Sequence, residues 1–320
     1  MDHILTPIAS YIERFEERFA SALSSDVSRV QEMSFHIQKN RGKRMRPALA
    51  LLSAQALGGC SDRVIDAAVG IELIQTATLI HDDVIDSAET RRGAEVLNLL
   101  WGTQAAVLMG DFLLVRALEI LVGLDSMDVM RAATRATRWM IEGELLESES
   151  GADGRDSVYF MMIDKKTASL MALACEIGGI LGSGSPEQIR QLAAYGKDIG
   201  IVFQITDDML DFIGDEETLG KPVGNDIREG KLTLPLIRAM DSCTNGEAKE
   251  IQQKIRRGVQ SDEDLKEVVN FVERYQGIEQ AREEARTYAQ SAIRNLEGLS
   301  DSDARNALEQ AVHYVAERRG

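Results

Sequence analysis

Apolar residues recur at helical spacing along most of the chain. The first stripe spans residues 4–22, and we interpret it as packing within the chain rather than as a subunit contact. The same spacing predicts helices over residues 47–57, 104–122 and 125–149. It also predicts a helix that runs from residue 62 into the acidic stretch at 82–86, and helices that begin at residues 158 and 187. No alternating strand pattern with hairpin turns stands out. The pattern predicts an all-α protein, folded as one large domain or two ordinary ones.

The stretch from Gly70 to Gly93 combines this apolar pattern with three aspartates. Uncharged side chains at helical spacing lead into Asp82, Asp83 and Asp86. Asp82 and Asp86 are four residues apart, so a helix places them on one face. Crowded carboxylates on an apolar helix need a cation, and Mg²⁺ is the natural one where phosphate is bound. The alternative is a solvated acidic helix end.

A second acidic cluster lies far downstream in the stretch GIVFQITDDMLDFIGD. Its acids are Asp207, Asp208 and Asp211, and Gln204 precedes Asp208 by one turn. Again an apolar run leads directly into the carboxylates. Two such helices facing each other would form an acidic, metal-binding mouth on an apolar cavity, which a single cluster does not indicate.

Basic residues gather at a few places in this acidic chain. Residues 40–47 (NRGKRMRP) are either a solvated loop or an anion site in which Lys43 and Arg46 hold a diphosphate. Arg91 and Arg92 follow the first acidic cluster and could bind a phosphate group. Lys165, Lys166 and Thr167 mark either a solvated helix end or a site. Residues 214–231, with Lys221 and Lys231, are the best candidate for a mobile lid.

Composition excludes several classes of protein. The net charge of −16 argues against a nucleic-acid partner and against a basic patch for anionic lipid. The start of the chain lacks the features of a secretory signal, and no uninterrupted 18-residue apolar run is present. Three widely spaced cysteines imply neither a disulfide framework nor a zinc site. We therefore expect a soluble, cytoplasmic protein without a membrane span.

Five segments resemble a known family. GKRMRP, HDDVID with the following RRG, KT, FQITDDMLD and GKPVGNDIREGK are similar, in order, to the signature segments of the trans-isoprenyl diphosphate synthases, or polyprenyl synthetases. The match spans roughly residues 40–240, and the chain most resembles the bacterial long-chain members. The resemblance implies a single all-α domain over residues 1–320, with helices around a deep central cavity, and a homodimer.

The resemblance also implies the chemistry. An allylic diphosphate, with farnesyl diphosphate as the expected primer, ionises to a carbocation; the double bond of isopentenyl diphosphate attacks it, and a proton is lost. Up to three Mg²⁺ ions are implied, with Asp82, Asp86 and Asp207 as ligands and the other aspartates of the two clusters in support. The allylic diphosphate would be held by Arg91, Lys166, Lys221 and Lys231. Isopentenyl diphosphate would be bound by Lys43, Arg46, Arg92 and Gln75. Thr167 and Gln204 would face the cationic intermediate.

Product length is expected to depend on the helix before Asp82. Ala77 and Thr78 are small, so the growing tail should pass them and Ile74 and stop deeper, where Trp139 and Met140 are the expected floor. With one helical turn of about 5.4 Å per isoprene unit, this predicts a product of roughly six to eight units, of the kind used for quinone side chains.

Several alternatives remain open. Gln75 stands where short-chain members have Gln and many long-chain members have His, and Glu147 departs from the family's usual Gln or Asp. The alternatives are a short-chain farnesyl or geranylgeranyl diphosphate synthase and the large subunit of a two-component synthase. A non-catalytic subunit and a class I terpene cyclase fit the two intact aspartate motifs less well.

Overall fold

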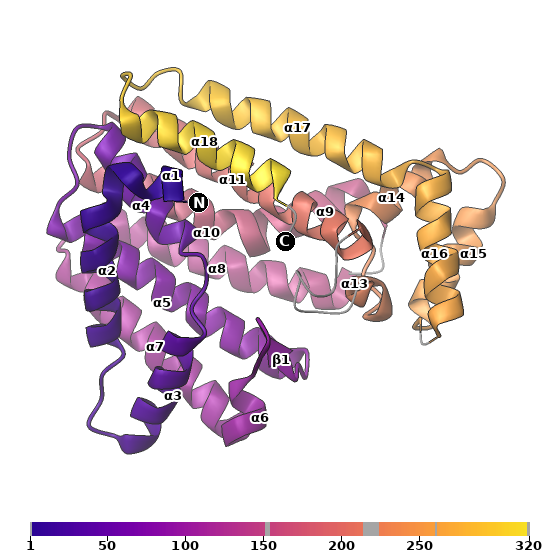
Figure 1. The fold of residues 1–320 in the computed structure, drawn as a ribbon, viewed down its shortest axis with the longest axis horizontal. Coiled ribbons are helices and arrows are strands. Elements are labelled where there is room, and N and C mark those ends of the chain that lie inside the picture. Colours follow the sequence, from indigo (N-terminus) through magenta and orange to yellow (C-terminus); the bar gives the residue numbers. More distant parts are fainter. Residues whose placement is uncertain (1, 151–153, 214–223, 260, 319–320) are drawn as a thin grey trace. The chain divides into compact units, whose positions relative to one another are not determined.

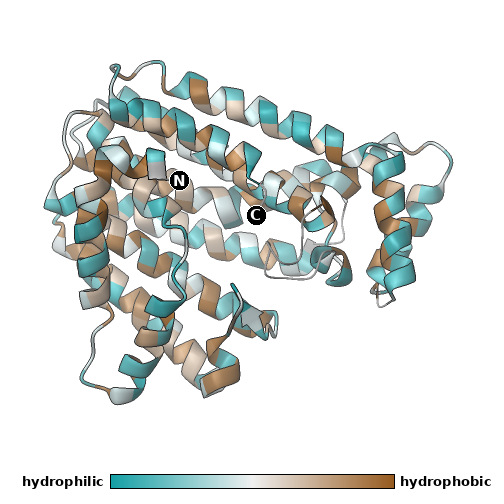
Figure 2. Cartoon of the chain, in the orientation of Figure 1, coloured by the Kyte–Doolittle hydropathy of each residue, from teal (hydrophilic) through white to brown (hydrophobic). Residues whose placement is uncertain are grey.

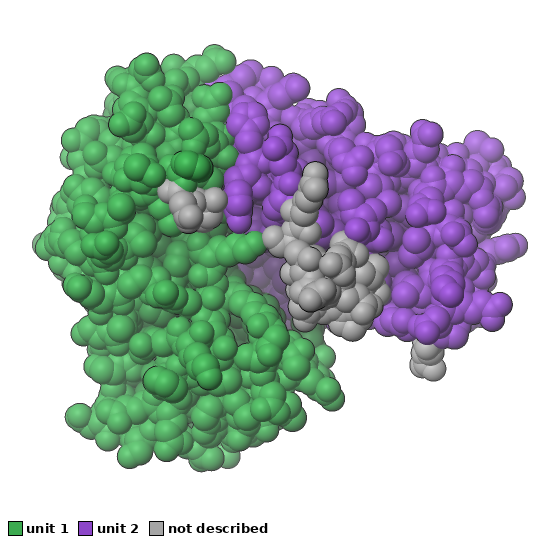
Figure 3. Space-filling model, viewed as in Figure 1, with its two compact units in different colours: residues 1–137, 170–196, 295–311 green, residues 138–169, 197–294, 312–320 purple. Residues whose placement is uncertain are grey.

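The computed structural model describes residues 2–150, 154–213, 224–259 and 261–318 (Figure 1). Helices make up nearly all of the described part, so the predicted all-α class is confirmed. Internal contacts divide the chain into two compact units, coloured in Figure 3. Unit 1 comprises residues 1–137, 170–196 and 295–311, and unit 2 comprises residues 138–169, 197–294 and 312–320. The single domain over residues 1–320 stays a prediction.

Unit 1 is formed mainly by residues 1–137. Its elements are α1 (Asp2–Leu5), the 3₁₀ turn η1 (Thr6–Ile8), α2 (Ala9–Ala22), α3 (Ser28–Lys39), α4 (Met45–Ala56), α5 (Asp62–Ile85), β1 (Thr90–Arg91), β2 (Ala94–Glu95), α6 (Leu97–Trp101) and α7 (Thr103–Gly123). Five helices contribute residues to both units: α8 (Met127–Ser150), α10 (Ser169–Leu181), α11 (Pro186–Ile213), α18 (Asp303–Glu317) and, through its last residue alone, α17 (Gly277–Asn295).

Unit 2 holds the remaining helices around one apolar core. These are α9 (Asp156–Ile163), the π-helical turn η2 (Asp164–Ala168), α13 (Asn225–Arg228), α14 (Leu234–Ser242), α15 (Glu247–Arg256), α16 (Asp262–Arg274) and nearly all of α17 (Gly277–Asn295). The core is built from side chains of α9, α11, α14 and α16, among them Tyr159, Ile205, Ile237 and Phe271. This core holds the second aspartate cluster, because α11 runs through it.

Helix α5 is the central helix of unit 1. It packs chiefly against α7, α4 and α2, and its residues from Val64 to Ile74 are almost all buried. A helix enclosed on all sides has no need of a polar stripe, and apolar positions recur around it in Figure 2. Of the helices described, α5 alone is long and apolar enough to cross a membrane, and 67% of its most apolar window is buried inside the protein.

The N-terminal stripe packs inside the chain, as predicted. Phe15 and Phe19 of α2 are buried and stack with ring centroids 5.8 Å apart. Elsewhere in unit 1, α10 lies close to α4 because glycines face it: a Cβ on Gly178 would come within 2.4 Å of the Ala50 carbonyl oxygen. Such approaches leave room only for glycine.

The observed boundaries follow the predicted ones for α7 and α8, and Ser61 is the N-cap of α5, although its side chain makes no capping hydrogen bond. A local feature differs from the expectation. A hairpin, β1–β2, pairs Thr90 with Glu95 and Arg91 with Ala94. Two-residue strands are too short to show a period, which is why the sequence pattern did not reveal them.

Candidate active site

The first aspartate cluster occupies the carboxyl end of α5. Asp82 and Asp83 are buried in the last turn, and the exposed Asp86 is the C-cap, with its backbone N–H donated to the Asp82 carbonyl 2.8 Å away. The carboxyl end of a helix carries partial negative charge, which disfavours further anions there. Carboxylates in this position are therefore stabilised by a bound cation.

The hairpin places two arginines beside this cluster. Its loop consists of Arg92 and Gly93, both with positive φ (54° and 75°), as a tight two-residue hairpin turn requires. On the strand before it, Arg91 donates from Nε to Asp83 Oδ1 at 2.7 Å. Burial raises the pKa of Asp83, and the charge of Arg91 opposes this shift. Arg91 and Asp83 thus form a charge-assisted pair in unit 1.

Arg92 and Arg46 form a cationic centre in the same unit. The Arg92 guanidinium lies against the backbone of Gly42, where a Cβ would be only 2.6 Å from Nη2, and it donates to the Asn40 carbonyl oxygen at 3.3 Å. The Nε atom of Arg46 is buried without a hydrogen-bond partner. Burial lowers the pKa of Arg46 to about 10, and the charge of Arg92 adds to this effect. An anion would satisfy both side chains. Lys43 is exposed on the same loop.

Arg44, from the same basic loop, has a different environment. Its guanidinium pairs with Glu16 at 2.9 Å and with the buried Glu72 at 2.7 Å. It also lies over the Phe19 ring, 4.4 Å from the centroid. Every strong interaction of this side chain is therefore made within unit 1. The loop supplies one structural arginine, Arg44, beside Arg46, whose Nε is left unpaired.

The second aspartate cluster lies in the last two turns of α11, again at a carboxyl end. Its three members have different surroundings. Asp207 retains 42% exposure of its side chain and pairs with Arg318 at 2.7 Å. Asp211 is fully buried and accepts the backbone N–H groups of Asn225 and Asp226 at the start of α13. Asp211 thus caps a neighbouring helix, whereas Asp207 is accessible to a ligand.

Asp208 is the centre of a buried hydrogen-bond chain in unit 2. Its two oxygens accept from the Tyr159 hydroxyl at 2.6 Å and from Gln204 Nε2 at 2.9 Å. Gln204 in turn accepts from the Thr167 hydroxyl at 2.8 Å. Burial, reinforced by the charge of Asp226, raises the pKa of Asp208 to about 8. The chain fixes the orientation of Gln204 and Thr167, the two residues predicted to face the reacting carbon.

Lys166 and Lys231 share a carboxylate. Lys166 bonds Glu144 at 2.7 Å and also contacts Glu147, and Lys231 lies 3.8 Å from Glu147. Burial alone would lower the pKa of both lysines, but Glu147 raises both above the ordinary value. This arrangement depends on Gly143 of α8, because a Cβ there would meet the Lys166 backbone nitrogen at 2.4 Å. Lys166 lies in the π turn η2 and not at the solvated end of a helix.

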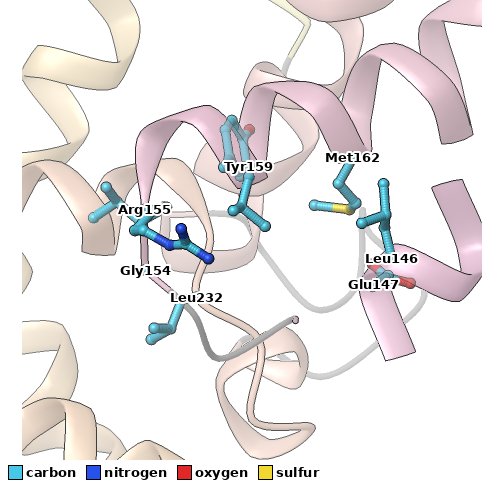
Figure 4. A pocket seen from close by; sticks show the side chains of 9 residues that line it. Leu146, Glu147, Gly154, Arg155, Tyr159, Met162 and Leu232 are labelled. Carbon is cyan, nitrogen blue, oxygen red and sulfur yellow. The ribbon is translucent and has the colours of Figure 1, made fainter. Parts of the chain in front are cut away.

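A small cavity adjoins this group of charges. Glu147 of α8 and Arg155, Tyr159 and Met162 at or near α9 line it (Figure 4). Its volume of about 20 Å³ has room for a water molecule but not for a prenyl chain. The deep central cavity that the resemblance implies stays a prediction.

The residues predicted to set product length differ in burial. Ala77 and Ile74 of α5 are buried, whereas Thr78 is partly exposed and donates its hydroxyl to the Ile74 carbonyl at 2.9 Å. In unit 2, Met140 is buried, whereas its neighbour Trp139 is 37% exposed, since successive helical residues point about 100° apart. The partly exposed Gln75 lies among them on α5. Lys221 lies outside the described residues.

The donor set fits Mg²⁺. All six side chains of the two clusters are carboxylates, the hard oxygen ligands that this ion prefers. Across the part of the chain that the structure describes, no three His, Cys, Asp or Glu side chains converge to form a complete metal cage. Mg²⁺ is ordinarily held by one or two carboxylates together with substrate phosphates and water, so an incomplete cage is what a diphosphate-carrying site requires.

Sequence reasoning missed three residues that the structure brings to the predicted ones. Tyr159 bonds Asp208, Glu144 bonds Lys166, and Arg318 bonds Asp207. The three-residue spacing of Glu144 and Glu147 on one helix could have indicated a carboxylate pair. For Tyr159 and Arg318 the sequence holds no such signal, because each contact spans at least 49 residues.

Comparison with known proteins identifies the class of protein. The sequence matches the polyprenyl synthetase family over residues 27–272, and the chain belongs to this family. It is 37% identical to a short chain isoprenyl diphosphate synthase of Methanothermobacter thermautotrophicus, over 99% of each chain. It is also 37% identical to the octaprenyl diphosphate synthase of Escherichia coli, over 92% of each chain.

Solved structures agree with this assignment. A polyprenyl synthase from Caulobacter crescentus, complexed with calcium and isoprenyl diphosphate, has a TM-score of 0.95 and 33% identity, and the match covers 100% of this chain and 98% of that one. The protein is therefore an enzyme, a prenyl chain-elongating diphosphate synthase. The relatives include short-chain and octaprenyl enzymes, so the family alone leaves the product length open.

The contrast between Arg44 and Arg46 gives a stability prediction. Arg44→Met should lower the free energy of unfolding by about 3–5 kcal/mol, because it removes the ion-pair partner of the buried Glu72 carboxylate. Arg46→Met should change stability less, because the Arg46 Nε has no hydrogen-bond partner to lose and Glu72 offsets the burial of its charge only in part. Urea unfolding measures both, with the exposed Arg41→Met as a control. Equal losses for Arg44→Met and Arg46→Met would contradict the assignment.

Proposed function

We propose that this enzyme condenses an allylic diphosphate with isopentenyl diphosphate to give a long all-trans polyprenyl diphosphate. The observation that carries the proposal is the pairing of acidic clusters at the carboxyl ends of α5 and α11 with cations suited to diphosphate. Bound Mg²⁺ would supply the positive charge that stabilises the departing diphosphate. The relative solved with calcium and isoprenyl diphosphate supports a divalent ion and this class of substrate.

The side chains divide by role in this proposal. Asp82, Asp86 and Asp207 would ligate the metal ions, as the resemblance implies, with Asp83, Asp208 and Asp211 in support through their bonds to other groups of the protein. Arg91, Lys166, Lys221 and Lys231 would hold the allylic diphosphate. The Glu147 carboxylate would offset the repulsion between the like charges of Lys166 and Lys231 in the free enzyme. The allylic diphosphate would take over this role from Glu147 when it binds.

The second diphosphate would occupy the cationic centre of Arg46 and Arg92, with Lys43 and Gln75 assisting. The support is the buried Arg46 Nε, which lacks a partner, and the approach of Arg92 to Gly42. Thr167 and Gln204 would turn oxygen atoms toward the carbocation, since their hydrogen-bond chain to Asp208 fixes them. The released diphosphate would accept the proton, so no side chain need act as the base.

A long product is favoured by the small residues before Asp82. Ala77 and Thr78 offer no large side chain that would stop a tail after three or four units, at about one helical turn per unit. Met140, buried in α8, is the better of the two predicted floor residues, because Trp139 is partly exposed. The short-chain relative and Gln75 favour the alternative of a short product. Products analysed after incubation with farnesyl diphosphate and isopentenyl diphosphate alone decide between these lengths and test for a partner subunit.

A homodimer and a cytoplasmic location complete the proposal. Helix α7 exposes Leu108, Val115, Leu118 and Val122, each 45–60% accessible and spaced by seven, three and four residues. This spacing forms the seam of a helix that pairs with another helix. An exposed apolar stripe of this kind marks an interface, and we propose a second copy of the chain as its partner. The three cysteines are free, as a reducing compartment would keep them.

Removing either proposed metal ligand should abolish condensation. Asp82→Ala and Asp207→Ala are expected to reduce turnover by at least about a thousandfold, because each takes away a ligand for the charge that stabilises the leaving group. The helical circular dichroism should be retained. Asp301→Ala, at an exposed carboxylate outside both clusters, is the control and should leave turnover unchanged. Turnover within a few-fold of wild type in either alanine variant would refute the two-cluster mechanism.

Enlarging Ala77 should shorten the product. Ala77→Tyr is expected to stop elongation at about three or four isoprene units while condensation continues, because the ring blocks the tail about one turn from the metal ligands. Ala77→Ser should leave the length unchanged. Chromatography of the dephosphorylated products measures this, with thermal melting as a check on folding. An unchanged product from a folded Ala77→Tyr enzyme would remove Ala77 from the tunnel wall.

A charge on the apolar stripe of α7 should dissociate the dimer. Val115→Glu together with Leu118→Glu is expected to give a monomer, because two carboxylates would be buried without partners at the interface. Val27→Glu, at an exposed apolar residue of α3's N-cap, is the control and should leave the mass unchanged. Size-exclusion chromatography with light scattering reads the mass. A double variant that stays dimeric would show that this stripe is not the interface.

A further inference from the structure

The end of the chain contacts the most accessible acid of the second cluster. Arg318 follows the last residue of α18, and its Nη2 donates to Asp207 Oδ1 at 2.7 Å. The same nitrogen lies 3.4 Å from the Phe203 carbonyl oxygen, and the guanidinium carbon lies 4.0 Å from the centroid of the Phe203 ring. The side chain is 11% exposed. All three partners belong to unit 2.

These contacts fix the orientation of the Arg318 guanidinium. Stacking on Phe203 fixes its tilt, and the two hydrogen bonds fix its rotation within its own plane. The Asp207 carboxylate is therefore oriented through Oδ1, while Oδ2 takes no part in the contact and the side chain keeps 42% of its exposure. Residues that bond a metal-ligating carboxylate in this way decide which oxygen faces the ion.

We propose that Arg318 is a positioning residue that presents Asp207 to a divalent cation. The inference rests on the proposed metal role of Asp207. Arg318 carries a permanent positive charge, so it also offsets the negative charge at the carboxyl end of α11. Loss of an outer partner of this kind lowers metal affinity by about 10- to 100-fold. A rival role, in which Arg318 competes with the metal for the carboxylate, has the opposite sign.

The test is the affinity for Mn²⁺ in the presence of inorganic diphosphate, followed by the electron paramagnetic resonance of free Mn²⁺. Arg318→Gln should weaken binding by about 10- to 100-fold. Arg318→Lys keeps the charge without the planar fork, so it should fall between wild type and Arg318→Gln. Phe203→Leu removes the stacking surface and should weaken binding in the same direction. Arg286→Gln, at a surface pair in unit 2, is the control and should change nothing.

The outcomes separate this inference from the proposed function. If Asp207→Asn binds Mn²⁺ as wild type does, the metal role of Asp207 fails, and the inference fails with it. If Asp207→Asn is weak but Arg318→Gln binds normally, the inference alone is overturned. Tighter binding by Arg318→Gln would show competition instead of positioning. Should Arg318→Gln fail to fold, Arg318→Lys and Phe203→Leu carry the same comparison.

Discussion

The site depends on negative charge at places where helices already end in negative charge. Both aspartate clusters occupy the carboxyl ends of long buried helices, α5 and α11, so the carboxylates and the peptide dipoles add. Burial disfavours a charged carboxylate, and it raises the pKa of Asp208 to about 8 against the opposing effect of the hydrogen bonds from Tyr159 and Gln204. The clusters instead keep Asp86 and Asp207 accessible, which is a stable arrangement only with cations at hand.

The basic side chains discussed above differ in their partners, and they fall into three kinds. Arg44 is fully committed to two glutamates and two aromatic rings, so it stabilises unit 1. Lys166 and Lys231 both lie near Glu147, the carboxylate that we propose an incoming diphosphate to replace. The buried Nε of Arg46 has no partner. A buried, unsatisfied donor lowers stability, and proteins retain such a group where a ligand satisfies it.

Local patterns made most of the helices and the motif residues predictable. Asp82 and Asp86, or the stripe of Phe15 and Phe19, are related by helical spacing, which the sequence states directly. Contacts across the chain could not be predicted in this way. The bond of Tyr159 to Asp208 and that of Arg318 to Asp207 depend on tertiary packing, and the π turn that carries Lys166 depends on the close approach to Gly143. The sequence therefore identified the chemistry but not its supporting contacts.

A net charge of −16 in a member of a family of diphosphate synthases presents an apparent conflict, because a diphosphate is itself an anion. Salt resolves much of it, because at physiological ionic strength charges farther apart than about 8 Å are largely screened. The electrostatic attraction of a diphosphate is therefore decided by the charged groups within a few ångströms of its site, and not by the net charge of the chain. Near Gly42 these groups include Arg46 and Arg92. Burial lowers the pKa of Arg46, Glu72 opposes this shift and Arg92 adds to it, so an anion beside the two arginines is favourable. At the aspartates the local sign has to be reversed by metal ions. We propose that isopentenyl diphosphate meets side-chain cations alone, whereas the allylic diphosphate meets metal ions as well as side-chain cations, so that the two differ in the positive charge that receives them.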